Sequence, residues 1–309
     1  MEKDEKIKLM LELREQEGLN RKEFALKYGI PYPTITDWEM GHRRIPEYFL
    51  RLLAYKVGLE SLKKVDYKIS LAEQLAVDYC CTPEDVGDNQ NHFTEFSKAD
   101  GQRVFDSIDN PVLKITVVND KLLFTGRADV IAICKEKYMG ETGQWFMDVH
   151  NFRIIEDMLK PLGHRIKTVH PFFLPADARV TTGDELDLIL YSRDEIEQFR
   201  GDDRFDEAFC FDEAAPDMIA VAACKDGKML GMAGASADSP TFWQIGINVF
   251  PEAEHNHVAT ALVSKIKYEI IKLGKVPYYG TSISNLASQR VALNSGFKPA
   301  WVELLSEEI

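Results

Sequence analysis

The sequence has little of three features that would mark a membrane, secreted or metal-binding protein. No apolar run approaches the ~18 residues that a membrane-spanning helix needs. The first six residues, Met-Glu-Lys-Asp-Glu-Lys, contain no apolar core of a secretory signal. The five cysteines show no CxxC spacing, which argues against disulfides and zinc sites. These absences predict a protein of the reducing cytoplasm, with no membrane partner and no bound metal.

Charge is unevenly distributed along the 309 residues. Residues 1–64 hold thirteen Lys and Arg against eleven Asp and Glu, a net charge of +2, whereas the whole chain carries −13. The remainder is therefore near −15, which would repel a phosphate backbone and could attract a cationic amine. A nucleic-acid function is thus expected only in the first 64 residues.

Residues 5–60 are predicted to form four or five short helices. Asn20 stands where an N-cap is needed, and Glu23 three residues later completes a capping-box pattern. Gly29 ends that helix, Pro33 suits the first turn of the next, and Gly41 ends it in turn. The pattern predicts an all-α N-terminal domain over residues 1–64.

The run GLNRKEFALKYGIPYPTITDWEMGHRRIP resembles the XRE-type helix-turn-helix family, in which the second helix lies in the major groove. The residues that match the family pattern are Ala25, Gly29, Ile30, Ile35, Trp38, Glu39 and Gly41. The resemblance implies base contacts from Tyr32, Thr34, Thr36 and Asp37. It also implies phosphate contacts, which position the protein without reading sequence, from Arg21, Arg43 and Arg44.

Two features of this helical region depart from the family. Arg21 stands where the family often has Gln, and Asp37 and Glu39 put two carboxylates on the helix offered to DNA. The alternative is therefore a small helical interaction module. If DNA is the target, a homodimer is expected, because such domains usually bind two half-sites.

The C-terminal region is predicted to alternate strands and helices. Four strands are expected at residues 184–191, 218–224, 229–235 and 243–249, with an Asp-Gly turn between the second and third. An amphipathic helix over 256–273, a strand over 276–280 and a helix after Asn285 follow. This order resembles the GNAT superfamily of N-acyltransferases over about residues 184–304. The predicted fold class is thus multidomain: the helix-turn-helix domain, then an α/β (α+β) GNAT-type fold.

The resemblance implies a site for acetyl-CoA. The pantetheine arm would pair with the main chain of Ile247, Asn248 and Val249, as an added strand does. The pyrophosphate would lie on the N-terminus of the next helix, where unpaired N–H groups favour anions. The residues expected there are His255, Asn256, His257, Val258, Ala259 and Thr260. Asn285 and Ser288 match positions that contact the arm.

Three positions depart from the GNAT pattern. Glu254 replaces a neutral or cationic residue, His257 replaces a glycine, and Ala292 replaces the Tyr that protonates the thiolate in many members. Tyr279 and Ser282 are the candidates to replace that Tyr, although packing also explains a Tyr in a strand. A carboxylate base found early on the preceding strand in some members is also absent, since Trp243 and Gln244 occupy that region.

Residues 69–176 separate the two regions. Strands are predicted over 113–118 and 121–125 with an Asn119-Asp120 turn, a helix over 128–137, a helix capped by Asn151, and a strand over 165–173. Residues 82–110 are expected to be mostly loop. The region is either a degenerate first GNAT-like half or an extension that completes the acceptor pocket. The predicted domains are therefore 1–64, 69–176 and 177–309.

Three functions are consistent with these patterns. The first is an N-acetyltransferase that moves an acetyl group from acetyl-CoA to an amine-bearing small molecule, peptide or aminoacyl group, fused to a DNA-binding domain. The second is a transcriptional regulator whose catalytically degenerate GNAT domain senses an acyl-CoA or another small ligand. The third is a toxin-like acetyltransferase that carries its own DNA-binding module.

Overall fold

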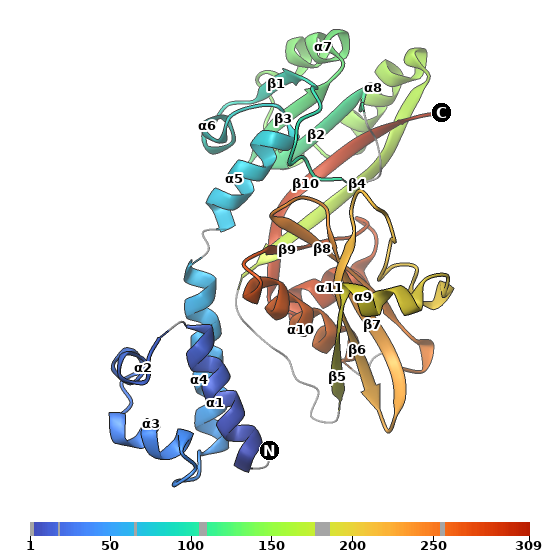
Figure 1. Ribbon diagram of the computed structural model, residues 1–309. Helices are drawn as coiled ribbons and strands as arrows, with labels where there is room; N and C mark the ends of the chain where they lie inside the picture. The colour runs from blue at the N-terminus through green and yellow to red at the C-terminus, as the bar shows by residue number, and fades with distance from the viewer. Residues whose placement is uncertain (1–2, 18, 65–66, 105–109, 177–185, 254–256) are drawn as a thin grey trace. The chain divides into compact units, whose positions relative to one another are not determined.

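A computed structural model describes residues 3–17, 19–64, 67–104, 110–176, 186–253 and 257–309. It divides into two compact units, one formed by the helical N-terminal residues and the other by the described residues from 67 onward. The regions predicted as 69–176 and 177–309 thus share one compact unit (Figure 1).

The first unit is the all-α domain expected from the sequence. Its helices are α1 (Lys3–Gln16), α2 (Arg21–Tyr28), α3 (Tyr32–Glu39) and α4 (Glu47–Lys64). The capping box is confirmed: the Asn20 side chain accepts hydrogen bonds from the amides of Lys22 and Glu23, and the Glu23 side chain accepts from the Asn20 amide. Phe24 and Ile35 are fully buried at the centre of this unit's core.

The second unit is built from helices on a long sheet. Its α-helices are α5 (Tyr67–Asp78), α6 (Pro83–Gly87), α7 (Ala128–Tyr138), α8 (Val149–Leu159), α9 (Arg193–Ile196), α10 (Val258–Lys272) and α11 (Leu286–Asn294). Its strands are β1 (His92–Glu95), β2 (Leu113–Val118), β3 (Lys121–Gly126), β4 (His164–Pro175), β5 (Asp187–Ser192), β6 (Asp217–Lys225), β7 (Lys228–Ala237), β8 (Phe242–Val249), β9 (Val276–Gly280) and β10 (Phe297–Glu308). Within the part of the chain that the structure describes, no helix has the length and apolar character of a membrane span.

The strands form one ten-stranded sheet in the order β1-β3-β2-β10-β4-β9-β8-β7-β6-β5. The two long strands β4 and β10 run antiparallel, side by side, through its middle (Figure 1). β4 comes from the middle region but pairs with β9, whereas β10 comes from the C-terminal region but pairs with β2. This interleaving explains why the two regions form a single unit.

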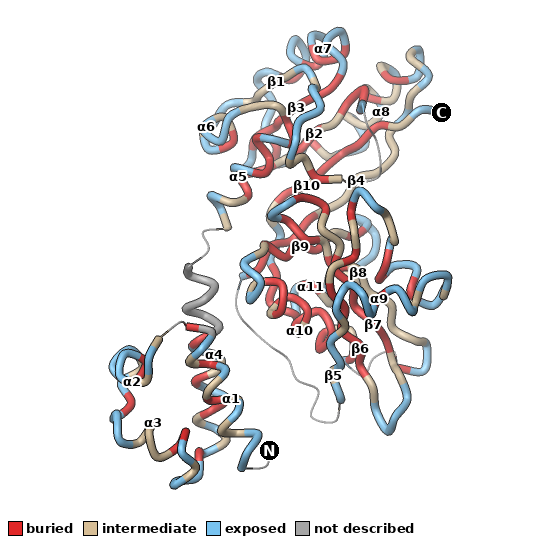
Figure 2. The backbone as a smooth tube through the Cα atoms, viewed as in Figure 1, coloured by how far each residue is buried: buried red, intermediate tan, exposed pale blue. Residues whose placement is uncertain are grey.

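Helices cover the sheet on both faces. α7 and α8 pack on β2 and β3 around a core that includes Phe124 and Ile155. α10 packs on β6, β7 and β8, and most of its residues are buried (Figure 2). The opposite face of β6 and β7 is covered by the segment after β5, through Phe205 and Phe209. β6 and β7 are therefore covered on both faces of the sheet.

The local predictions held where turn and cap residues were clear. Asn119 and Asp120 have positive φ values of 48° and 68°, as a tight hairpin turn requires. The prediction that Asn151 caps α8 was wrong, because Asp148 is the cap and Asn151 donates to the carbonyl of Phe146. The strands β1 and β10 were not predicted.

Candidate active site

The parallel strands β8 and β9 separate part-way along their length. Their pairing ends at Gln244 and Tyr278, after which β9 pairs with β4 instead. β8 continues to Val249, held on its other side by β7. Residues 245–249 therefore have one edge that no strand of the described chain pairs with. Their N–H and C=O groups on that edge can hydrogen-bond to an extended ligand.

Of the three residues predicted on this edge, Asn248 has a second function. Its side-chain oxygen accepts hydrogen bonds from the amides of Glu207 and Ala208 at 3.1 and 2.7 Å. Its side-chain nitrogen donates to Asp206 at 2.8 Å. The Asn248 side chain thus ties a neighbouring loop to the sheet, which leaves its backbone as the group available to a ligand.

The residue before α10 has an unusual backbone conformation. His257 is exposed and lies in the left-handed region with φ of 59°, a conformation that favours glycine. Its carbonyl accepts the amide of Ala261, so the amides of Val258, Ala259 and Thr260 precede the first helical bond. His257 thus occupies a backbone conformation that glycine adopts without strain. His255 and Asn256 lie outside the described residues.

Of the residues predicted to contribute to the site near α11, Asn285, Ser288 and Tyr279 are linked by hydrogen bonds, whereas Ser282 lies apart from them. Asn285 caps the helix by accepting the amide of Ser288, whose hydroxyl lies 2.9 Å from the Tyr279 hydroxyl. Burial raises the pKa of Tyr279, so its phenol stays protonated at neutral pH. Ser282 is exposed and lies 3.2 Å from the hydroxyl of Ser284 instead. The structure thus joins Tyr279 and Ser288 and leaves Ser282 apart.

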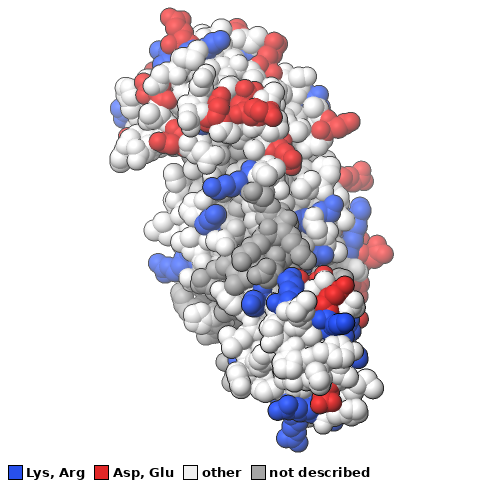
Figure 3. All heavy atoms as spheres, turned by 90° about the vertical axis from the view of Figure 1, so that its left-hand side faces the viewer, with Lys and Arg blue, Asp and Glu red and all other residues white. Residues whose placement is uncertain are grey.

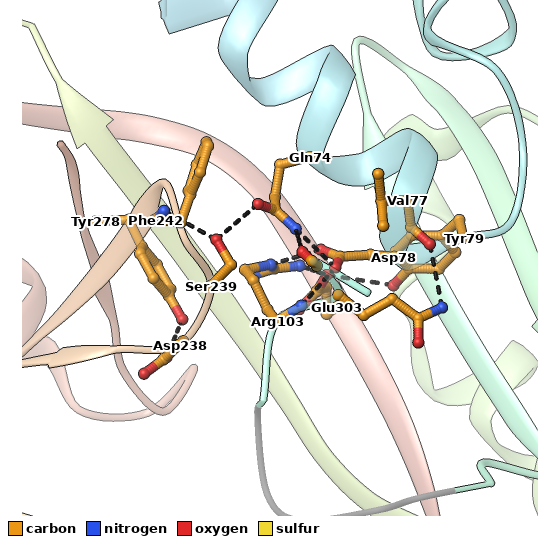
Figure 4. A network of polar contacts seen from close by, with 12 residues as sticks. Gln74, Val77, Asp78, Tyr79, Arg103, Asp238, Ser239, Phe242, Tyr278 and Glu303 are labelled. Carbon is orange, nitrogen blue, oxygen red and sulfur yellow. Dashed lines mark hydrogen bonds and ion pairs between the residues drawn. The ribbon is translucent and has the colours of Figure 1, made fainter. Parts of the chain in front are cut away.

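Sequence reasoning missed a buried carboxylate beside the point where β8 and β9 separate. Asp238, 3% exposed, accepts hydrogen bonds from Tyr278 and, at 2.6 Å, from Ser236. Figure 4 shows the Tyr278 hydroxyl directed at Asp238. The same hydroxyl lies 2.9 Å from the side-chain oxygen of Gln244. The run Ser-Ala-Asp-Ser-Pro at residues 236–240 is typical of a turn, and it gives no indication that the acid is buried.

Burial raises the pKa of Asp238 to about 6. The hydrogen bonds from Ser236 and Tyr278 and the charge of Arg103 act in the opposite direction, and burial outweighs them. At neutral pH the group is therefore mostly ionised but close to its midpoint. A carboxylate with that pKa is suited to accept and return a proton near pH 7.

A second polar cluster lies away from this region. Asp85, Asp88 and His92 place their ligand atoms within 4.8 Å of one another. Lys121, nearly buried, donates to Asp88 at 2.9 Å and to the Asp85 carbonyl. An ammonium group therefore already pairs with the Asp88 carboxylate, and the Asp85 carboxylate completes the capping box of α6. The cluster has a structural explanation.

In the first unit, the residues predicted to face bases lie along α3. Tyr32 is about half exposed, and Thr34 and Thr36 are intermediate. The Thr36 hydroxyl donates to the Tyr32 carbonyl at 3.0 Å. Arg43 and Arg44 are exposed in the loop after the helix. Figure 3 shows Lys and Arg side chains on the surface of this unit, interspersed with Asp and Glu.

Arg21 is held within the unit. Its Nε donates to Glu39 at 2.7 Å, and Arg14 donates to the other oxygen of that carboxylate at 2.7 Å. The hydrogen bond to Glu39 raises the pKa of Arg21. Glu39, which the sequence placed on the helix offered to DNA, is buried between the two arginines. It therefore stabilises the domain and is not presented to a ligand.

Comparison with known families agrees with the division of the chain into a helical N-terminal unit and a second, α/β unit. Residues 10–54 match the helix-turn-helix family model, and residues 187–297 match the model of the acetyltransferase (GNAT) family. The chain therefore joins an XRE-type helix-turn-helix domain to a GNAT acetyltransferase domain. No curated protein matches the chain.

Several solved structures are similar to part of the chain at low sequence identity. A GCN5-related N-acetyltransferase-like protein from Streptococcus suis is 13% identical, with a TM-score of 0.40, over 68% of this chain and 89% of its own. A GNAT-family protein from Novosphingobium aromaticivorans is 20% identical, with a TM-score of 0.34, over 48% and 68%. A GCN5-related N-acetyltransferase from Kribbella flavida is 14% identical, with a TM-score of 0.38, over 49% and 62%.

Proposed function

We propose that the protein transfers an acetyl group from acetyl-CoA to an amine acceptor and binds DNA through its first 64 residues. One observation carries the first part: β8 keeps an open edge after it separates from β9. The pantetheine arm would pair with the backbone of Ile247, Asn248 and Val249 along that edge. A backbone N–H there would polarise the thioester carbonyl, which stabilises the charge that develops on attack.

The start of α10 would hold the pyrophosphate. The first amides of the helix, from Val258, Ala259 and Thr260, are the donors, and the helix dipole favours the anion. His257, the residue before these donors, has a positive φ of 59°. His255 and Asn256, which precede it in the sequence, are the other proposed pyrophosphate contacts. Asn285 and Ser288 would contact the arm from the start of α11.

The thiolate that leaves must receive a proton. Ala292 is fully buried and has no proton to give. The Tyr279 phenol, 2.9 Å from the Ser288 hydroxyl, can supply one through that hydroxyl, which then takes the Tyr279 proton. Its raised pKa keeps the phenol protonated at neutral pH, so it cannot act as a base there. Ser282 is the weaker candidate because its hydroxyl lies apart from this pair.

Most of the proposed DNA contacts lie on α3 and in the loop that follows it. Tyr32, Thr34 and Thr36 would face bases, and Arg43 and Arg44 would contact phosphates. Arg21 would contribute less than the other arginines, because it is bonded to Glu39. A homodimer would match two half-sites of DNA.

Calorimetric titration of acetyl-CoA tests the first part of the proposal. The wild-type protein is expected to bind with a micromolar Kd, about −8 kcal/mol. His257→Gly is expected to bind at least as tightly, since glycine prefers this backbone conformation and lets phosphate approach closely. His257→Glu is expected to weaken binding at least about tenfold, because it places a negative charge beside the pyrophosphate. No binding of millimolar acetyl-CoA to wild-type protein would refute the proposal.

The second candidate is a regulator that binds acetyl-CoA without turning it over. The full burial of Ala292, where many GNAT members have a proton donor, favours it. This candidate requires that acetyl-CoA and DNA change each other's affinity by the same factor. Equal DNA affinity with and without saturating acetyl-CoA would exclude it.

A further inference from the structure

An open cavity of about 290 Å³ lies beside β8, on the face of the sheet opposite α10. Trp243 and Ile245 pack in the core that contains α10. Gln244 and Gly246 alternate with them and line the cavity, because successive side chains of a strand point to opposite faces. The cavity therefore begins at Gln244, where β8 and β9 separate.

The outer wall of the cavity is the segment from Asp206 to Phe209, held close to the sheet. A Cβ atom at Gly234 would lie 1.9 Å from the Ala208 carbonyl oxygen, and one at Gly246 would lie 1.9 Å from that of Glu207. Only glycine allows so close an approach of two backbones. The Asn248 side chain then fixes the segment through three hydrogen bonds. The glycines and the Asn248 side chain thus hold this wall of the cavity in place against the sheet.

The lining of the cavity is acidic. Its carboxylates are Asp206, Glu207, Asp212, Asp217 and Asp238, and none of its described lining residues is Lys, Arg or His. Asp238 is the deepest, since it is almost fully buried and still lines the cavity. The volume suits a small molecule rather than a folded partner.

We propose that this cavity takes a small aliphatic amine with a second positive charge, and that Asp238 is the general base that deprotonates it. The inference rests on the proposed acetyl transfer and names its substrate class. One ammonium group of a diamine would reach Asp238, next to the open edge of β8. The other would remain charged among the carboxylates of the outer wall, which neutralise it.

The proposed step balances as follows in atoms and charge. The acceptor ammonium gives one proton to the Asp238 carboxylate, and its freed lone pair forms the C–N bond to the thioester carbonyl carbon. The C–S bond then breaks with its electron pair going to sulfur. A second proton leaves nitrogen as the amide forms, and the thiolate takes up one proton to become the CoA thiol. Asp238 later returns its proton to water.

The groups around Asp238 are compatible with this exchange. Ser236 and Tyr278 hold its two oxygens by hydrogen bonds. Arg103 and Asp217 are the nearby charges, of opposite sign, and burial dominates both in setting the pKa near 6. Asp217 itself has a raised pKa, because of burial, and accepts the amide of Phe211. It therefore supports the wall beside the base.

Rates of CoA thiol release with 1,4-diaminobutane and n-butylamine test the proposal. For the wild-type protein, kcat/KM is expected to be at least about tenfold higher for the diamine, because only the diamine places a second charge in the acidic cavity. Asp238→Asn is expected to lower kcat/KM by about 100-fold or more. It should also remove the fall in rate below pH 6 that protonation of Asp238 causes. Asp129→Asn, at an exposed carboxylate outside the cavity, is the matched control and should change neither.

Calorimetry with acetyl-CoA distinguishes a failure of this proposal from a failure of the proposed acetyl transfer on which it rests. Asp238→Asn is isosteric, and its amide can keep both neighbouring hydrogen bonds, so it should bind acetyl-CoA like the wild-type protein. If wild-type protein binds acetyl-CoA but n-butylamine reacts as well as the diamine, the cavity assignment is wrong. If Asp238→Asn keeps full activity with an unchanged pH profile, Asp238 is not the base. If wild-type protein fails to bind acetyl-CoA, the proposed function itself fails.

Discussion

Replacing Arg103 with leucine is expected to lower the free energy of unfolding of the second unit by about 3–5 kcal/mol. Arg103 is nearly fully buried, and it donates from Nε to Asp78 at 2.6 Å and from Nη2 to Glu303 at 2.5 Å. Figure 4 shows these two carboxylates converging on the guanidinium. Leucine would leave both carboxylates buried without their cation.

The directions of the pKa shifts support this expectation. Burial alone would raise the pKa of Asp78, but the charges of Arg103 and Lys114 outweigh it, so the pKa is lowered. Burial would likewise lower the pKa of Arg103, yet Asp78 and Glu303 raise it well above its usual value. Asp78 and Arg103 thus stabilise each other's charged forms, and Arg103 joins α5 to β10 through its hydrogen bonds to Asp78 and Glu303.

Urea unfolding measured by circular dichroism checks the prediction. Arg127→Leu is the matched control, because Arg127 forms an exposed ion pair with Asp129 and such pairs contribute about 0–1 kcal/mol. Its free energy of unfolding should stay within about 0.5 kcal/mol of wild type. Equal stability of the Arg103→Leu and Arg127→Leu proteins would contradict the account of this network.

Replacing Glu39 with glutamine is expected to destabilise the first unit by about 2 kcal/mol, because Arg14 and Arg21 lose the buried charge that neutralises them. The two arginines are partly exposed, so the loss should be smaller than for Arg103. A helical domain of this size has only a few kcal/mol of stability in total. DNA binding by the unit should therefore weaken as its folded fraction falls.

Amide hydrogen exchange of α2 and α3 in the full-length protein measures this effect locally. Exchange should accelerate about thirtyfold in those helices, as 2 kcal/mol implies, and should not change in the second unit. Glu12→Gln is the control, because Glu12 pairs with Lys8 at 3.9 Å on the exposed face of α1. Unchanged exchange in the Glu39→Gln protein would show that the buried ion pairs do not hold the domain together.

Local sequence signals predicted much of the fold. The Asn20 capping box, the Asn119-Asp120 turn and the Asp226-Gly227 turn each depend on neighbouring residues, and the structure has all three. A helix was also expected after Asn285, and α11 begins there. These features are readable because the energy that favours them comes from contacts within a few residues.

The sheet order was not predictable in the same way. β10 carries Glu303 and Ser306 on its buried positions, so its pattern does not alternate cleanly. Both polar residues are buried because distant groups satisfy them: Arg103 bonds Glu303, and the Leu113 amide donates to Ser306. Such pairings join residues nearly 200 positions apart, and no local pattern specifies them.

Part of the candidate site was likewise predictable from local sequence, and part of it was not. The resemblance led to the open edge of β8 and to the start of α10, because those are sequence-local features of the fold. Asp238 was not predicted, because its burial depends on Tyr278 and on the segment that covers β7. A carboxylate acquires a raised pKa from its surroundings, which the order of residues alone does not show.

Acetyl-CoA is proposed to bind along the open edge of β8 and at the start of α10. Amide hydrogen exchange with and without saturating acetyl-CoA tests this placement. We expect slower exchange in residues 245–249 and 257–261, and no change in the hairpin 113–126 of the middle region. Protection in the hairpin, or no protection anywhere at saturating acetyl-CoA, would contradict the claim.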